Sequence, residues 1–321
     1  MASKNVPKYI NGYTTYDFLG RGSFANVFRC SKEGNNYAMK RINSQERFKR
    51  YAIREIEFLS QLDNPYIVKM VDNFMEEDIQ YLVFEFLRVN LYKHMFKNNQ
   101  FPNFKKFAKY SFQISDGLAY LHAKSIVHCD LKLENIMVDN YDNLKIIDLG
   151  SSMKSNSFLK KKNLYIQSRY YRAPEILYEI GFSDKIDIWS MGIILTEMIL
   201  RRCVFNGKDS QEMIYKIADF IGIPELGVYT HSIYYDKLFE MKNDKLCYRS
   251  CANIYKVKGF REDRLEEYLI NGIKTNFDDI CDYQIENTVA FVHKILDYDY
   301  NMRLSAEQCK DELLLLESEF E

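Results

Sequence analysis

Residues 127–150 read Val-His-Cys-Asp-Leu-Lys-Leu-Glu-Asn-Ile-Met-Val-Asp-Asn-Tyr-Asp-Asn-Leu-Lys-Ile-Ile-Asp-Leu-Gly, and this stretch says most about the structure. Two short apolar runs, 136–138 and 144–147, flank a polar segment, which is typical of two strands joined by a turn. Such a hairpin would bring the loop at 130–135 close to Asp148 at one edge. The stretch therefore predicts a polar site beside a hairpin.

The polar residues of this stretch are the ones that phosphoryl transfer requires. One carboxylate, Asp130, could accept a proton, while Asn135 and Asp148 could hold Mg²⁺. Phosphoryl transfer suits this grouping because its catalysis is mostly positioning and charge neutralisation. Taken singly, an Asp or Asn at a turn more often serves the backbone. The whole set at this spacing favours the catalytic interpretation.

The composition is that of a compact globular protein with no nucleic-acid or membrane partner. The chain has 321 residues, 13 glycines and 5 prolines, with no low-complexity tract, so a substantial core can form. The net charge of −1 provides no basic field that would attract nucleic acid. The apolar run Ile188–Thr196 is far shorter than the ~20 residues that a membrane span needs.

Cysteine usage indicates a reducing compartment. Seven cysteines, an odd and scattered set, are typical of free thiols in an intracellular protein. The N-terminus lacks the apolar core of a secretory signal. We therefore expect the protein in the cytoplasm, the nucleus or both. We also expect it to be a monomer.

Periodicity along the chain predicts an α+β fold with two lobes. Up to residue 87 the pattern favours strands with one helix, Arg50–Leu62. From residue 91 onward the pattern is mainly helical, most clearly at Phe104–Lys124 and Ser183–Arg201. We expect a small β-rich lobe over 1–87 and a large, mainly helical lobe over 88–321.

Weaker motifs precede the hairpin in a fixed order. Gly20 and Gly22 flank an arginine between two predicted strands, where backbone N–H groups could approach phosphates. A glycine pair of this kind is more often a simple turn. Lys40 ends a later strand, and Glu55 follows fifteen residues on, in the predicted helix. A lysine there is usually an edge or snorkelling residue, but Glu55 could pair with it and aim it at phosphate oxygens.

In this order the motifs resemble the signature set of the eukaryotic protein kinases. The resemblance covers almost the whole chain and implies one protein-kinase domain over 1–321, with ATP and Mg²⁺ as cofactors. It implies that Gly20 and Gly22 lie over the ATP phosphates, and that Lys40, paired with Glu55, binds the α- and β-phosphates. Within the hairpin stretch the implied roles are a catalytic base, a lysine that steadies the transferred phosphate, and two Mg²⁺ ligands. These would be, in order, Asp130, Lys132, and the pair Asn135 and Asp148.

The same resemblance implies a nucleotide pocket with aliphatic walls and a backbone edge. Four residues would sandwich the adenine, one would be the gatekeeper, two would bind the adenine edge through their backbone, and one would face the ribose. In that order they are Leu19, Val27, Ala38 and Met137, then Phe84, then Glu85 and Leu87, then Asn90. The family's usual glycine, proline and phenylalanine are replaced at Ala25, Leu133 and Leu149.

Further matches lie in the predicted larger lobe. Ala173-Pro174-Glu175 matches the end of an activation segment, which would span 148–175. Asp187 begins a second motif and would both cap its helix and hold the backbone of the catalytic loop. Arg303 is placed to pair with Glu175.

Finer features resemble the DYRK family of the CMGC group, and its Yak branch in particular. The run Tyr165-Ile-Gln-Ser-Arg-Tyr-Tyr-Arg, the Gly-Ser-Ser after Asp148, and Cys129 in place of the usual arginine carry this resemblance. Residues 222–281 occupy the place of the group's characteristic insert. HIPK kinases share the run but usually have alanine in place of Cys129, so a HIPK-like kinase is the alternative.

The DYRK resemblance gives Tyr165 a regulatory role. It implies that Tyr165 is autophosphorylated, and that Arg169 and Arg172 pair with its phosphate. The simpler interpretation is a packed aromatic residue in a chain with 25 tyrosines.

The resemblance implies a dual-specificity kinase that phosphorylates Ser/Thr of protein substrates, often before proline. Two other classes stay open: a pseudokinase scaffold and a small-molecule phosphotransferase of related fold. A pseudokinase is expected to lack Lys40, Asp130, Asn135 or Asp148, and all four are present. The Ala-Pro-Glu segment and the helix with Trp189 disfavour the phosphotransferase.

Overall fold

The computed structural model describes residues 9–22, 24–154, 166–225, 228–230, 264–278 and 280–318, with residues 232, 234, 236, 239–242 and 245–248. They divide into two compact units. The first contains the residues up to Leu91 together with Glu134–Ser152, and the second contains Tyr92–Leu133 and the residues from Met153 onward. The first unit thus includes a segment that the predicted two-lobe division places in the larger lobe.

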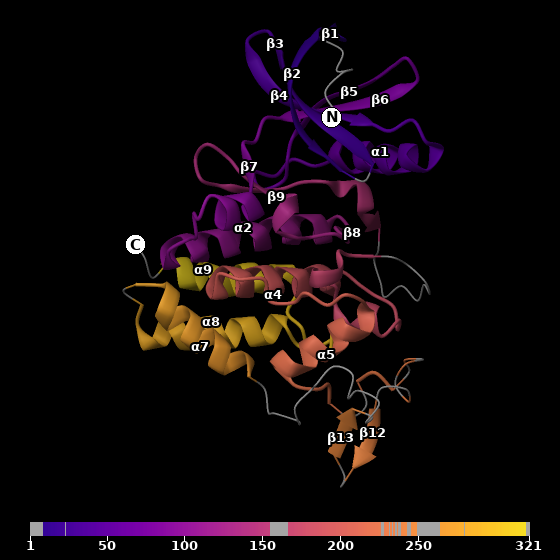
Figure 1. Ribbon diagram of the computed structural model, residues 1–321. Helices are drawn as coiled ribbons and strands as arrows, with labels where there is room; N and C mark the ends of the chain where they lie inside the picture. Colours follow the sequence, from indigo (N-terminus) through magenta and orange to yellow (C-terminus); the bar gives the residue numbers. More distant parts are fainter. Residues whose placement is uncertain are drawn as a thin grey trace. The chain divides into compact units, whose positions relative to one another are not determined.

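The first unit is built on an antiparallel sheet of six strands with one helix against it (Figure 1). The strand order is β1-β2-β3-β4-β6-β5. The strands are β1 (Tyr9–Ile10), β2 (Tyr13–Arg21), β3 (Ala25–Lys32), β4 (Asn35–Ile42), β5 (Met70–Glu76) and β6 (Ile79–Glu85).

Helix α1 (Glu46–Leu59) contacts β4 and β6. Its buried side chains Phe48, Ala52, Glu55 and Leu59 recur every three or four positions, which is the stripe of a half-buried helix. The helix was expected at Arg50–Leu62. It begins earlier, with acidic Glu46 in its first turn, and ends at Leu59, before the cap residue Ser60.

The predicted hairpin is confirmed. It consists of β9 (Ile136–Val138) and β10 (Leu144–Ile146), which form a three-stranded sheet with β7 (Val89–Asn90). The carboxylate of Asp139 accepts the N–H groups of Tyr141 and Asn143, both at 2.8 Å. This side chain therefore closes the turn, as Asp commonly does.

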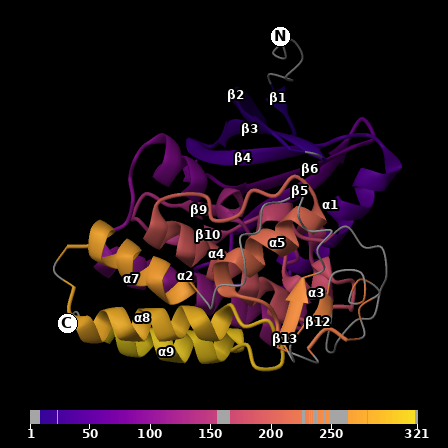
Figure 2. The ribbon, with the colours of Figure 1, turned by 60° about the horizontal axis from the view of Figure 1, so that its bottom comes forward.

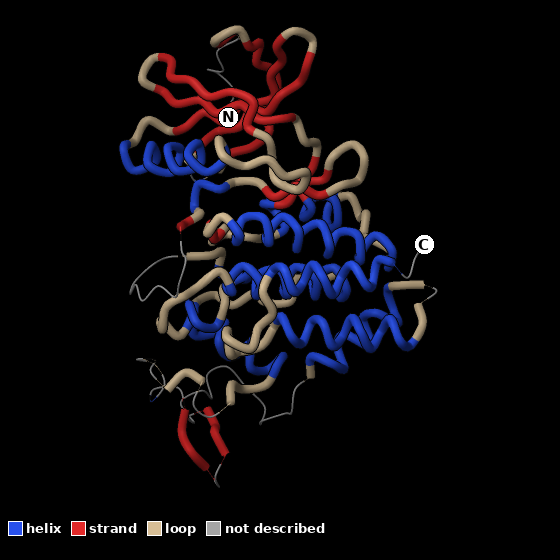
Figure 3. Tube along the Cα trace, turned by 180° about the vertical axis from the view of Figure 1, so that it is seen from behind, coloured by secondary structure: helices blue, strands red, loops and turns tan. Residues whose placement is uncertain are grey.

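The described part of the second unit is mainly helical (Figure 3). The long helices are α2 (Phe104–Ala123), α4 (Lys185–Leu200), α5 (Ser210–Ile221), α7 (Leu265–Asn276), α8 (Asp282–Ile295) and α9 (Ala306–Ser318). The short elements are α3 (Pro174–Leu177), the π-helix Lys93–Lys97, the 3₁₀ turn Arg169–Tyr171, and the strands β8 (Ile126–Val127), β11 (Met153–Lys154), β12 (Phe239–Lys242) and β13 (Lys245–Tyr248). Two more 3₁₀ turns, Leu133–Asn135 and Leu149–Ser151, flank the hairpin of the first unit.

Helix α4 forms the core of the second unit. Every residue from Ile186 to Ile199 is buried, as expected for a helix that is apolar all round. It contacts α2, α7 and α8, and α8 lies beside α9 (Figure 2). The α+β fold class and the two predicted long helices are confirmed. No helix among the described residues is long and apolar enough to cross a membrane.

Candidate active site

Lys40 on β4 lies between two carboxylates of the first unit. Its Nζ is 2.7 Å from Oε2 and 3.0 Å from Oε1 of Glu55, and 2.7 Å from Oδ1 of Asp148. Burial alone lowers the pKa of Lys40, but the charges of Asp148 and Glu55 raise it above the ordinary lysine value. The lysine is therefore held as an ammonium ion at a fixed place, as the sequence pattern predicted.

Helix α1 and the end of the hairpin place these carboxylates. Glu55 is on the buried stripe of α1 and is 2% exposed. Asp148 has a left-handed backbone (φ 65°, ψ 66°), which is uncommon for a non-glycine residue. The next residue, Leu149, is fully buried, so this apolar exchange for phenylalanine keeps a buried anchor directly after Asp148.

Asn135 and Asp148 are candidate metal ligands at the open end of the hairpin. The carbonyl oxygen of Asn135 accepts the N–H of Ile147 at 2.9 Å, so residues 135 and 147 are held together. The Asp148 side chain is 36% exposed. One carboxylate and one amide oxygen suit Mg²⁺, which is usually bound by one or two such ligands plus phosphates and water. Among the described residues, no group of three or more His, Cys, Asp and Glu side chains could hold a metal ion by itself.

The residues predicted to contact the nucleotide also belong to the first unit. Gly20 is opposite Val27 in the β2–β3 pair, Ala38 is opposite Phe84 in the β4–β6 pair, and Asn90 is opposite Met137 in the β7–β9 pair. Leu19 is 38% exposed on β2, and Leu87 is 8% exposed just after β6. Their roles toward a nucleotide stay predictions.

Glu85 is fixed on both its backbone and its side chain. Its N–H donates to the carbonyl of Lys69 at 3.1 Å, and its carboxylate accepts the N–H of Lys69 at 2.8 Å. The same carboxylate is 2.9 Å from Nζ of Lys145 on β10. A contact from Glu85 to adenine would therefore use its carbonyl group.

Asp130 and Lys132 belong to the second unit and contact each other. Nζ of Lys132 is 2.7 Å from Oδ2 of Asp130, while Oδ1 accepts the backbone N–H (3.0 Å) and the hydroxyl (2.7 Å) of Ser168. Lys132 also donates to the Ser168 hydroxyl at 2.9 Å. Sequence reasoning missed Ser168, and its place in the Gln-Ser-Arg run was the one available signal.

Asp187 organises the backbone before Asp130. Its carboxylate accepts the N–H groups of His128 (2.7 Å) and Cys129 (3.0 Å). The predicted hold on the catalytic loop is therefore confirmed. The predicted capping role is wrong, because α4 begins at Lys185 and its N-cap is Asp184. Cys129 is 2% exposed and left-handed (φ 64°), so a bulky arginine there would need a different arrangement.

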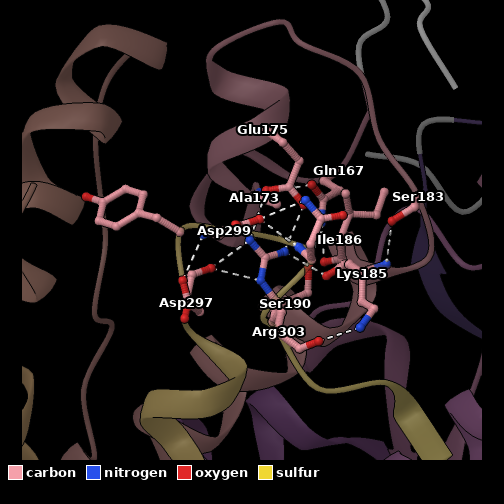
Figure 4. A network of polar contacts seen from close by, with 12 residues as sticks. Gln167, Ala173, Glu175, Ser183, Lys185, Ile186, Ser190, Asp297, Asp299 and Arg303 are labelled. Carbon is pink, nitrogen blue, oxygen red and sulfur yellow. Dashed lines mark hydrogen bonds and ion pairs between the residues drawn. The ribbon is translucent and has the colours of Figure 1, made fainter. Parts of the chain in front are cut away.

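The end of the activation segment is held by buried polar contacts. Arg172 donates from Nε to the carbonyl of Ile166 and from Nη2 to the carbonyl of Gln167, both at 3.0 Å. Gln167 has φ 61°, and its side-chain amide binds Ala173, Ile186 and Ser190 (Figure 4). Tyr165 lies outside the described residues, and the predicted regulatory roles of Arg169 and Arg172 stay predictions.

The predicted pair of Glu175 and Arg303 is confirmed. Nη1 and Nη2 of Arg303 lie 2.8 and 3.1 Å from the two carboxylate oxygens, a bidentate contact. Arg303 also donates to the carbonyls of Asp297 and Lys185 (Figure 4). Both side chains are almost completely buried.

The lysine with its two carboxylates, the Asp130 loop and the buried Glu175–Arg303 pair together point to one protein family, and comparison with known sequences identifies it. The family described as "Protein kinase domain" matches residues 13–315, and the chain belongs to this family.

Particular relatives carry the resemblance further. The chain is 34% identical over 242 residues to the probable dual specificity protein kinase YAK1 homolog of Encephalitozoon cuniculi, covering 72% of this chain and 58% of that protein. It is 36% identical over 225 residues to dual specificity protein kinase YAK1 of Saccharomyces cerevisiae, covering 66% and 27%. It is 34% identical over 227 residues to dual specificity tyrosine-phosphorylation-regulated kinase 3 of Homo sapiens, covering 66% and 37%. The resemblance to Yak and DYRK kinases is confirmed, and the chain spans less than two thirds of each of these relatives.

Proposed function

We propose that this chain is an ATP-dependent protein kinase that transfers the γ-phosphate to Ser or Thr of protein substrates. The observation that carries the proposal is Lys40 held between Glu55 and Asp148 at 2.7 Å from each. A half-buried lysine paired with a buried glutamate suits phosphate binding, because phosphoryl transfer depends on a cation held in place on the phosphates. The relatives' names, which include dual specificity kinases, agree with this activity.

One group of residues would bind ATP and Mg²⁺, and a second group would act on the substrate and the transferred phosphate. Lys40 would bind the α- and β-phosphates, and Asn135 and Asp148 would hold Mg²⁺, which neutralises phosphate charge when bound. Asp130 would orient the substrate hydroxyl and take its proton as the oxygen bonds to the γ-phosphorus and the bond to ADP breaks. Lys132 would stabilise the negative charge of the transferred group.

A preference for proline after the phosphorylated residue follows from the activation segment. The carbonyl of Gln167 accepts a hydrogen bond from Arg172, and the backbone at Gln167 is left-handed. A substrate residue docked there would find no acceptor for its N–H, and proline is the residue without one. We therefore propose proteins with a serine or threonine followed by proline as the substrate class.

Dual specificity would come from autophosphorylation of Tyr165. This rests on the Tyr165 run and on the names of the relatives. Mass spectrometry of bacterially expressed protein tests it: we expect phosphate on Tyr165, and full activity with unmodified Tyr165 would contradict it. The intracellular location and the monomeric state are proposed on the sequence features alone.

The test of kinase activity is transfer of labelled phosphate from Mg-ATP to a Ser-Pro peptide panel, with matched Ser-Ala peptides. Wild type should label the Ser-Pro peptides, and both Asp148→Asn and removal of Mg²⁺ by EDTA should abolish labelling. Equal signals from wild type and Asp148→Asn would end the kinase proposal and leave a scaffold. Loss of the Ser-Pro preference alone would favour another substrate class.

A further inference from the structure

Three aromatic rings from two segments meet beside the glycine turn of the first unit. Phe24 follows Gly22 by two positions, and Phe48 and Tyr51 lie on α1. The ring of Phe24 stacks on that of Tyr51, with centroids 4.3 Å apart and planes at 13°, and lies 5.5 Å from the ring of Phe48. We call Phe24, Phe48 and Tyr51 the aromatic cluster.

Helix α1 connects this cluster to the candidate active site. Tyr51 precedes Glu55 by four positions, so their side chains share one face of the helix. A Cβ built on Gly150 would lie 3.6 Å from Oε2 of Glu55 and 3.7 Å from Cβ of Tyr51. Both side chains therefore border the turn that follows Asp148.

The backbone of the glycine turn is tied to the strand that carries Lys40. The carbonyl of Phe24 accepts the N–H of Asn43 at 2.9 Å, and Asn43 directly follows β4. The N–H of Gly22 donates to the carbonyl of Ala25 at 2.9 Å, which closes the turn. The ring of Phe24 is thus held over α1 by a short, hydrogen-bonded segment.

The stack of Phe24 on Tyr51 lies outside the core cluster of the sheet. Other stacked rings of the first unit, such as Phe74 on Tyr81 at 5.3 Å, belong to a cluster that includes fully buried residues of the sheet. Phe24 and Tyr51 are only half-buried, and they join a turn to a helix. Their contact therefore fixes the turn relative to α1.

We propose that Phe24 and Tyr51 form an aromatic clamp that couples the glycine turn to the helix bearing Glu55. When the glycine turn closes on nucleotide phosphates, the clamp holds α1 in place, so that Glu55 stays paired with Lys40. Phosphate binding at the turn and the Glu55–Lys40 pair therefore favour each other. Both rings are positioning residues. The inference rests on the proposed function, because it needs nucleotide phosphates at the glycine turn.

The experiment measures binding of a fluorescent ADP analogue with Mg²⁺ to the full chain. The variants are Phe24→Leu, Tyr51→Leu and the double variant, since leucine keeps apolar bulk but removes the ring. Each single variant should raise the Kd about three- to tenfold, the range of one aromatic pair. The double variant should add little to either single one, because the coupling is lost only once.

Two controls separate the clamp from a general loss of stability. Tyr51→Phe keeps the ring and should bind the analogue as wild type does. Phe74→Leu removes stacked contacts with Tyr13 and Tyr81 from the same unit, so it should lower the Tm and leave the Kd unchanged.

Three results would overturn the clamp: wild-type Kd in both single variants, fully additive effects in the double variant, or an equal rise in Kd in Phe74→Leu. If Tyr51→Leu does not fold, Phe24→Leu decides alone, and an unchanged Kd there overturns the clamp. A wild-type chain that neither binds the analogue nor labels peptides would instead overturn the proposed function. The two failures are therefore distinguishable.

Discussion

The buried carboxylate of Glu55 fixes where the ammonium group of Lys40 lies. An ion pair that is 2% exposed on one side and 15% on the other is costly unless both charges are satisfied. Asp148 supplies a second carboxylate to Lys40. The three side chains therefore carry one negative charge in excess, which favours a bound cation. We expect the removal of one of the three to redirect the side chains of the other two.

Glu55→Gln tests this role because it keeps the shape of the side chain and removes its charge. We expect kcat/KM for peptide phosphorylation to fall about 10- to 100-fold, since Lys40 would turn toward Asp148 and away from the phosphates. Glu57→Gln, at an exposed position of the same helix, is the matched control and should keep wild-type kcat/KM. An unchanged value in Glu55→Gln would show that the pair has no catalytic role.

At the scale of elements, Arg303 joins three segments that are far apart in the sequence. It binds Glu175 on α3, the carbonyl of Lys185 at the start of α4, and the carbonyl of Asp297 after α8. Trp189 on α4 lies against its guanidinium, 5.2 Å from the ring centroid. Each donor of the buried cation is directed at an acceptor, which is what makes burial of the charge tolerable.

Glu175→Gln should therefore destabilise the second unit strongly. Loss of the carboxylate leaves the buried guanidinium without its counter-charge, at a cost of about 3–5 kcal/mol. The free energy of unfolding from urea titration measures this. Glu179→Gln changes a carboxylate that accepts the partly buried hydroxyl of Tyr234 at 3.0 Å. It should cost far less, and equal losses would contradict the account.

Helix α4 also packs tightly against the end of α8. A Cβ on Gly192 would lie 2.6 Å from Cδ2 of Leu296 and 3.2 Å from Cγ1 of Ile295. Gly192→Ala should thus lower the free energy of unfolding by about 1–3 kcal/mol through overpacking. Gly20→Ala is the control, because a Cβ there would meet nothing within 4 Å. An unchanged free energy of unfolding in Gly192→Ala would contradict the tight packing of α4 against α8.

At the scale of the whole molecule, the sequence predicted local structure better than it predicted contacts between distant residues. The hairpin, the buried helix α4 and the order of the motifs depend on spacing, so they could be inferred from residues 127–150 and from the resemblance. The contact of Ser168 with Asp130, thirty-eight positions away, was not predicted. The resemblance paired Glu175 with Arg303 but paired no residue with Asp130, and only the folded chain brings Ser168 to it. The capping role of Asp187 was wrong for a similar reason: Asp187 is an acidic residue near a helix start, but its carboxylate binds the backbone of His128 and Cys129.

We propose above all that Asp130 takes the proton of a substrate hydroxyl as the γ-phosphate of ATP is transferred to it, and that Lys40 holds the other phosphates. The most direct test is single-turnover transfer of labelled γ-phosphate to a Ser-Pro peptide, comparing wild type with Asp130→Asn. We predict a transfer rate at least ~100-fold lower in Asp130→Asn with an unchanged Kd for the ADP analogue, because only the proton acceptor is lost. Equal single-turnover rates in the two proteins would contradict the account.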